Sequence, residues 1–178
     1  QHYKAIAQAS LLPIILYNVP GRTASNMTAE TTLRLAKDFK NIVAIKEASG
    51  NLDQISTILK HRPKDFLVIS GDDALTLPIL ALGGDGVISV VGNALPQEFS
   101  NLVHAALKGD LETARKEHFK LLEFTTHIFA EGNPAGIKEA LKVLGICDNT
   151  LRLPLVNVSE ATAKKIYHAL ADAEVVKL

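Results

Sequence analysis

Cysteine and tryptophan are nearly absent from this sequence, which has one cysteine and no tryptophan among its 178 residues. The lone Cys147 cannot form an internal disulfide bond, which is typical of proteins from a reducing compartment such as the cytoplasm. We expect its thiol to be buried and inert. Aromatic residues make up only 5% of the chain, so the sequence offers no platform on which nucleic-acid bases would stack.

The chain also lacks an excess of either charge and any long apolar run. Lys+Arg and Asp+Glu both number 19, and a neutral chain has no electrostatic attraction for nucleic acid or an anionic membrane. No apolar run reaches the ~20 residues of a membrane span, and no signal peptide is visible. We therefore expect no nucleic-acid partner and no membrane partner. The sequence starts with Gln1 inside a helical pattern, so we expect it to be part of a longer chain.

What the sequence does contain is a set of short apolar segments, each followed by a helical pattern. These segments cover residues 14–17, 42–45, 66–70 and 87–91. Strands that alternate with helices are typical of a parallel sheet with crossover connections. From residue 108 the strand pattern stops and the helical spacing continues. The pattern predicts an α/β domain over 1–107 and a helical domain over 108–178.

The segment over residues 42–51 carries the clearest chemical signal. Its apolar strand ends in Lys46, and a polar turn containing a glycine follows. Ligand sites of α/β proteins lie beyond the carboxyl ends of such strands. Apolar walls disfavour the ammonium form of a lysine, and a free amine attacks carbonyl carbons. The alternative is a solvated lysine. After the turn, Asn51 and Gln54 predict a capping box at the start of a helix.

Polar side chains follow the neighbouring strand at the same edge. Tyr17 ends the first apolar segment, and Arg22 lies in the loop beyond it. A phenol can pass protons, and a guanidinium can bind a carboxylate. Together with the Lys46 amine they predict a site for a 2-oxo acid. The alternative is that Tyr17 only packs and that Arg22 pairs with a surface acid.

Other motifs give weaker signals. Asp72 and Asp73 could bind a metal, but they are better placed to cap the following helix. Residues 83–86 (GGDG) are similar to a phosphate cradle, but they precede a strand and would lie at the opposite edge of the sheet. The histidines show no ligand spacing, so we expect no metal site.

Several of these segments together closely resemble the dihydrodipicolinate synthase family. It belongs to the pyruvate-dependent class I aldolases, which also include N-acetylneuraminate lyase. The resemblance covers essentially the whole chain and rests on residues 17–23 (YNVPGRT), 45–52 (IKEASGNL), 70–73 (SGDD) and 84–90 (GDGVISV). Arg22 and the residues after Lys46 favour a synthase over the lyase, which generally lacks that arginine.

The resemblance implies a (β/α)8 barrel with a C-terminal helical domain. This chain would supply the second half of the barrel, about four βα units, and the helical domain. The family's first half, with a threonine of its proton relay and a second tyrosine, lies outside the printed residues. We therefore expect the isolated chain to be inactive, with barrel-facing apolar side chains exposed to water.

The resemblance also implies roles for individual residues. Lys46 would form a Schiff base with pyruvate, and Tyr17 would donate and accept protons. Arg22 would bind the carboxylate of L-aspartate 4-semialdehyde, while the main chain at Ile88 and Gly71 would line the pyruvate pocket. The implied reaction is a lyase-class step toward diaminopimelate and lysine. It needs no cofactor and no metal, and the enzyme would be a homotetramer, a dimer of dimers.

Two alternatives to this function stay open. One is a lyase of the same superfamily that cleaves a sugar acid to pyruvate and shares Lys46 and Tyr17. The other is a non-catalytic half-barrel that binds a partner or oligomerises.

Overall fold

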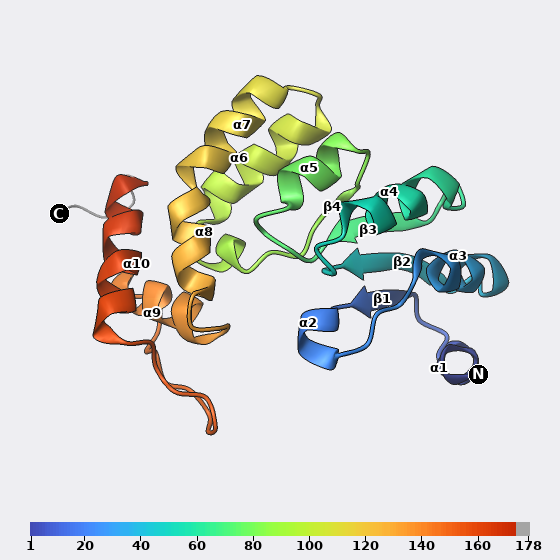
Figure 1. The fold of residues 1–178 in the computed structure, drawn as a ribbon, viewed down its shortest axis with the longest axis horizontal. Helices are drawn as coiled ribbons and strands as arrows, with labels where there is room; N and C mark the ends of the chain where they lie inside the picture. The colour runs from blue at the N-terminus through green and yellow to red at the C-terminus, as the bar shows by residue number, and fades with distance from the viewer. Residues whose placement is uncertain (174–178) are drawn as a thin grey trace. The chain divides into compact units, whose positions relative to one another are not determined.

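A parallel sheet of four strands is the framework of the first part of the chain (Figure 1). This computed structural model describes residues 1–173. The strands are β1 Ile14–Asn18, β2 Ile42–Glu47, β3 Leu67–Ser70 and β4 Gly86–Val87. They lie in sequence order, and each neighbouring pair is parallel. The fold class is therefore α/β, as the alternation of apolar segments and helical patterns predicts.

Helices occupy every crossover between these strands. α1 His2–Ala9 precedes β1, α2 Pro20–Thr23 and α3 Ala29–Asp38 lead to β2, α4 Leu52–His61 leads to β3, and α5 Thr76–Ala81 leads to β4. Thr28 caps α3, because its side chain accepts a hydrogen bond from the amide of Thr31. Asn51 caps α4 in the same way through the amide of Gln54. These caps satisfy amides that have no partner inside the helix, so both helices begin at defined residues.

The helices bury one face of the sheet. Residues of β1, β2 and β3 join a core with the inner stripes of the helices, and this core includes Ala7, Leu16, Leu35, Ile42, Ile45, Ile55, Ile58, Phe66, Val68 and Ile79. The opposite face is open: Ile15, Tyr17 and Leu67 are 48%, 47% and 44% exposed. In β1 and β3 the alternation follows the two-residue period of a strand, whereas in β2 the neighbours Ala44 and Ile45 are both buried. It confirms the expectation that barrel-facing apolar side chains of this chain meet water.

The fourth strand is much shorter than its apolar segment predicts. The prediction of a strand over 87–91 is wrong, because β4 is Gly86–Val87 and Val91 already begins the 3-10 helix η1 Val91–Asn93. β3 ends at Ser70, whose carbonyl accepts the Ile88 amide at 2.9 Å. Beyond that bond β4 has no partner residue on β3, and the Ser89 hydroxyl accepts the Gly92 amide in a turn.

After η1, every regular element of the described chain is an α-helix. These helices are α6 Pro96–Leu107, α7 Leu111–Lys120, α8 Leu122–Phe129, α9 Ala135–Val143 and α10 Glu160–Asp172. α6 packs on α7, and α10 packs on both α8 and α9. α8 and α9 approach so closely that a Cβ on Gly136 would lie 2.1 Å from the Ile128 carbonyl oxygen. Glycine is therefore required at that contact.

The contacts divide the chain into one unit of Gln1–Ile88 and a second unit that begins at Ser89. The predicted boundary between an α/β domain over 1–107 and a helical domain over 108–178 stays a prediction, since the extent of a barrel is defined only when all its strands are present. Within residues 1–173, no helix is long and apolar enough to cross a membrane. The prediction of a buried Cys147 is wrong: the thiol is exposed, because it lies in an exposed run, residues 145–148, after the end of α9.

Candidate active site

The carboxyl ends of β1 and β2 place Tyr17 and Lys46 next to each other. The two residues are partners in the parallel register, so their side chains leave the sheet on the same face. The Lys46 amine lies 4.2 Å from the centroid of the Tyr17 ring, over its face. This contact with the ring face fixes the direction of the lysine side chain. The pair lies on the face that no helix of residues 1–88 covers, where a small molecule can reach it.

Gly71, directly after β3, makes room for the lysine. A Cβ on Gly71 would lie 2.9 Å from the Ala48 Cβ and 3.0 Å from both Cγ and Cε of Lys46. Any other residue would push the lysine side chain away from its present path. The Gly71 amide donates to the Glu47 carbonyl at 2.8 Å, which holds the glycine against β2. The structure thus brings three of the predicted site residues together.

The Lys46 amine has no hydrogen bond and no ion pair with any residue of 1–173. An amine without a polar protein partner is available to a ligand. Ile88, another predicted site residue, follows β4 at the same edge, and its amide is used by the Ser70 carbonyl. Its own carbonyl is therefore the main-chain group that remains for a ligand.

Arg22 belongs to the short helix α2, two residues beyond the end of β1 (Figure 1). Its side chain is exposed, and no acidic residue of the described chain forms an ion pair with it. Among residues 1–173 the alternative that Arg22 pairs with a surface acid therefore finds no partner. Among the described residues, no hydrogen bond or ion pair joins Arg22 to Lys46 or Tyr17, and Arg22 lies four residues beyond the carboxyl end of β1.

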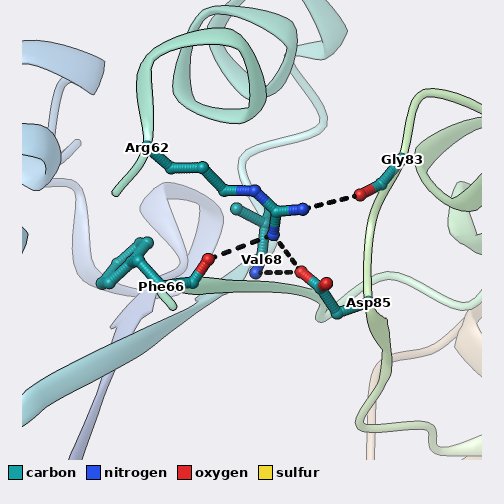
Figure 2. Close-up of polar contacts among 5 residues, drawn as sticks. All are labelled: Arg62, Phe66, Val68, Gly83 and Asp85. Carbon is teal, nitrogen blue, oxygen red and sulfur yellow. Dashed lines mark hydrogen bonds and ion pairs between the residues drawn. The ribbon is translucent and has the colours of Figure 1, made fainter. Parts of the chain in front are cut away.

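The opposite edge of the sheet shows different chemistry (Figure 2). Arg62, which follows α4, donates to the carbonyls of Phe66 and Gly83 at 3.1 Å each and pairs with the carboxylate of Asp85. That carboxylate also accepts the amide of Val68 at 2.7 Å. The GGDG segment therefore lies at the amino ends of β3 and β4, as predicted, and its acid holds an arginine in place.

A hollow of about 280 Å³ lies beside this cluster, lined by Ser56, Leu59, Lys60, Arg62, Leu82 and Gly83. It is not a candidate active site, because the groups suited to carbonyl chemistry lie at the other edge. Asp72 caps the turn before α5, where its carboxylate accepts the amides of Ala74 and Leu75. In the part of the chain that the structure describes, no three His, Cys, Asp or Glu side chains are grouped to hold a metal ion.

A buried polar cluster beneath the site is absent from the predictions. It consists of Asn18, Glu47 and Gln54. The predicted capping box is half right: the Gln54 amide donates to the Asn51 side chain, but the Gln54 side chain does not accept the Asn51 amide. The Gln54 side chain donates to the Glu47 carboxylate at 3.1 Å, while the Asn51 amide donates to the Ser49 hydroxyl instead. The sequence did contain an indication of this cluster: Asn18 and Glu47 directly follow Tyr17 and Lys46, so in a strand their side chains point to the opposite face, which the helices cover.

Comparison with known proteins agrees with this geometry. The Dihydrodipicolinate synthetase family matches residues 1–173. A 4-hydroxy-tetrahydrodipicolinate synthase of Phocaeicola vulgatus is 55% identical over 175 residues, which cover 98% of this chain and 59% of that protein. The chain is similar to the crystal structure of dihydrodipicolinate synthase from Thermotoga maritima, with TM-score 0.96 and 42% identity over 99% of this chain and 61% of that one.

A third similar protein is the chloride inhibited dihydrodipicolinate synthase from Acinetobacter baumannii, whose crystal structure is a complex with pyruvate. It has TM-score 0.95 and 38% identity over 99% of this chain and 60% of that one. The chain thus spans about three fifths of the length of these relatives, and its four βα units correspond to part of their barrel.

Proposed function

Because this chain belongs to the dihydrodipicolinate synthase family, we propose that the protein containing it condenses pyruvate with L-aspartate 4-semialdehyde through a Schiff base on Lys46. The observation that carries the proposal is the unpaired Lys46 amine 4.2 Å from the Tyr17 ring. A nucleophilic amine next to a proton-carrying phenol is what an imine-forming aldolase requires.

The proposed reaction begins when the Lys46 amine attacks the keto carbon of pyruvate and water leaves. The protonated imine draws electrons from the pyruvate methyl group, which loses a proton to give an enamine. Tyr17 passes protons in these steps. The enamine carbon then bonds to the aldehyde carbon of L-aspartate 4-semialdehyde, and the amino group of that substrate displaces Lys46 as the ring closes. None of these steps needs an external oxidant or reductant.

The remaining predicted residues bind rather than react. Arg22 offers two parallel N–H groups for the carboxylate of the aldehyde substrate. Gly71 keeps open the space that the lysine and its imine occupy, and the Ile88 carbonyl lines the pocket. These assignments are supported by the positions of the three residues, since Gly71 and Ile88 directly follow β3 and β4 and Arg22 lies four residues beyond β1.

We assign the lysine-biosynthetic reaction to the cytoplasm, which the single cysteine supports, and to a homo-oligomer, a dimer of dimers. For residues 1–178 alone we expect self-association and no turnover. The half-exposed Ile15, Tyr17 and Leu67 support this expectation, since an open apolar sheet face associates in water. Light scattering of the isolated chain, combined with a turnover assay, tests it; an active, monodisperse monomer would contradict it.

Turnover assays on the complete gene product test the function itself. Pyruvate should be consumed only when L-aspartate 4-semialdehyde is present, and N-acetylneuraminate should not be cleaved to pyruvate. Cleavage of the sugar acid would establish the lyase alternative. No turnover with either substrate, together with full activity of a Lys46→Ala variant in a binding assay, would establish the non-catalytic module.

A further inference from the structure

The carboxylate of Glu47 is fully buried, at 0% exposure, directly after the reactive lysine. In a strand, consecutive side chains point to opposite faces, so Glu47 lies on the helix-covered face, beneath Lys46. No lysine, arginine or histidine of the described residues forms an ion pair with it. A buried carboxylate without a cation is costly unless hydrogen bonds compensate it, so its retention needs a physical reason.

Only N–H donors surround this carboxylate. The Asn18 amide nitrogen lies 3.1 Å from each carboxylate oxygen. The Ser49 main-chain amide donates at 2.7 Å, and the Gln54 side chain donates at 3.1 Å. An ionised carboxylate accepts hydrogen bonds and donates none, so its charged form satisfies all of these donors.

The donors come from the elements that position the reacting pair. Asn18 is the last residue of β1, directly after Tyr17, and it is 2% exposed. Glu47 is the last residue of β2, directly after Lys46. The bond from Asn18 to Glu47 therefore joins the two strand ends on the buried face, while Tyr17 and Lys46 meet on the open face. A shift of one strand end against the other would break the buried bond and separate the reacting pair.

The same cluster also fixes the loop that follows Arg22. The Asn18 side-chain oxygen accepts the Met27 amide at 2.9 Å, and its nitrogen donates to the Asn26 side chain at 2.9 Å. Gln54 accepts from Asn26 at 2.9 Å. Two strand ends, a helix and this loop thus converge on one acid.

We infer that Glu47 is a positioning residue for the reaction: with Asn18 and Gln54 it holds Tyr17 and Lys46 at their working separation without touching substrate. The inference rests on the proposed function, since it gives Glu47 a positioning role at the site where Lys46 is proposed to react. Small displacements of reacting groups cost rate rather than ground-state affinity. Loss of the carboxylate should therefore lower kcat more than it raises the KM for pyruvate.

Glu47→Gln in the complete gene product tests this inference. The substitution preserves size but replaces an accepting oxygen with a donor, among neighbours that are all donors. We expect kcat to fall about tenfold or more, with the KM for pyruvate changed by no more than about twofold. Gln54→Ala, which removes one donor from a half-buried position, should lower kcat by a smaller factor and covers the case in which Glu47→Gln folds poorly.

A matched control and a rescue separate positioning from a general loss of stability. Asp85→Asn removes the corresponding carboxylate at the other edge of the sheet, and it should lower the thermal midpoint with kcat unchanged. The double variant Glu47→Gln/Gln54→Glu exchanges the donor and the acceptor of the same hydrogen bond, and it should recover most of the kcat lost in Glu47→Gln. The single variant Gln54→Glu places two carboxylates next to each other, and its kcat should stay below that of the double variant.

An unchanged kcat in Glu47→Gln, or a double variant no faster than Glu47→Gln, would overturn the inference while wild-type turnover left the proposed function intact. A wild-type protein that forms no imine with pyruvate would overturn the proposed function, and this inference with it.

Discussion

The two edges of one parallel sheet hold their cations in opposite ways. At the carboxyl edge, the Lys46 amine has no hydrogen bond or ion pair within residues 1–173 and lies against the Tyr17 ring. At the amino edge, the Arg62 guanidinium is used by Asp85 and by the carbonyls of Phe66 and Gly83 (Figure 2). A cation whose donors are engaged by the protein stabilises the fold, and one whose donors are unused can bind or react.

The acids at the two edges show the same contrast in another form. Asp85 neutralises Arg62, which follows α4, and it also accepts the Val68 amide of β3. These bonds stabilise the packing of α4 against β3 and β4. Glu47 is buried without a cation and accepts only from amides. The carboxyl edge thus retains a costly arrangement, and functional sites are where such costs are expected. Active sites of parallel α/β folds lie at this edge, and the other edge contributes stability.

The largest expected effect comes from replacing Lys46 by arginine and Arg62 by lysine, substitutions that keep a basic side chain but change its chemistry. Lys46→Arg leaves a group that stays protonated and cannot form the imine, so turnover should fall on the order of 10⁴-fold. Arg62→Lys cannot reach the same acceptors at once, so it should lower the free energy of unfolding with turnover per folded molecule unchanged. Steady-state kinetics and denaturant titration of both variants would show this division; a catalytic loss in Arg62→Lys would erase it.

Arg22→Ala should give the next largest effect. A guanidinium that binds a carboxylate contributes about 1.5–3 kcal/mol, so kcat/KM for L-aspartate 4-semialdehyde should fall about tenfold to 150-fold. Imine formation with pyruvate should be unaffected, because no hydrogen bond or ion pair of the described residues joins Arg22 to Lys46. Arg22→Lys, which keeps the charge but loses the fork, serves as the intermediate case. Normal kinetics with L-aspartate 4-semialdehyde together with impaired pyruvate binding would show that Arg22 binds pyruvate instead, which would contradict this assignment.

Glycine substitutions at the two edges should give a smaller effect. The Cβ of Gly71→Ala would press on Cγ and Cε of Lys46 at 3.0 Å, so kcat should fall about tenfold. Gly86→Ala is the matched control in β4, since nothing lies within 4 Å of its Cβ. Equal activities of the two variants would show that the space beside Lys46 does not matter.

The smallest effect on turnover, none, is expected from the Arg62–Asp85 pair. Its side chains are 21% and 29% exposed, so removing either partner should cost about 1–3 kcal/mol of unfolding free energy. The two single variants to alanine and the double variant form a cycle whose coupling energy should be about 1 kcal/mol. A coupling energy of zero would mean that the pair contributes nothing, and the amino edge would lose its assigned role.

The sequence predicts the strands and the reacting pair through a simple rule. Apolar runs that alternate with helices make a parallel sheet, and residues near the carboxyl ends of its strands meet at one edge, as Tyr17, Lys46 and Gly71 do. The length of β4 could not be predicted, because its apolar run continues after its partner strand has ended. The exposed Cys147 could not be predicted either, since cysteine is usually buried.

The cluster around Glu47 shows a deeper limit. Gln54 has the spacing of a capping box, and only the tertiary structure reveals that its side chain bonds to Glu47 instead. Local spacing predicts local bonds, whereas the choice between a local and a distant partner depends on which strand ends are adjacent. That adjacency follows from the register of β1 and β2, which no pattern within either segment specifies.

Trapping of the imine is the most direct test of the central claim that the unpaired amine at the carboxyl edge is the reacting group. The complete gene product is incubated with pyruvate and borohydride, digested, and mapped by mass spectrometry. The account predicts one reduced pyruvate per chain on the peptide that holds Lys46, and none in Lys46→Arg. Modification of a different lysine, or no covalent adduct while turnover proceeds, would contradict it.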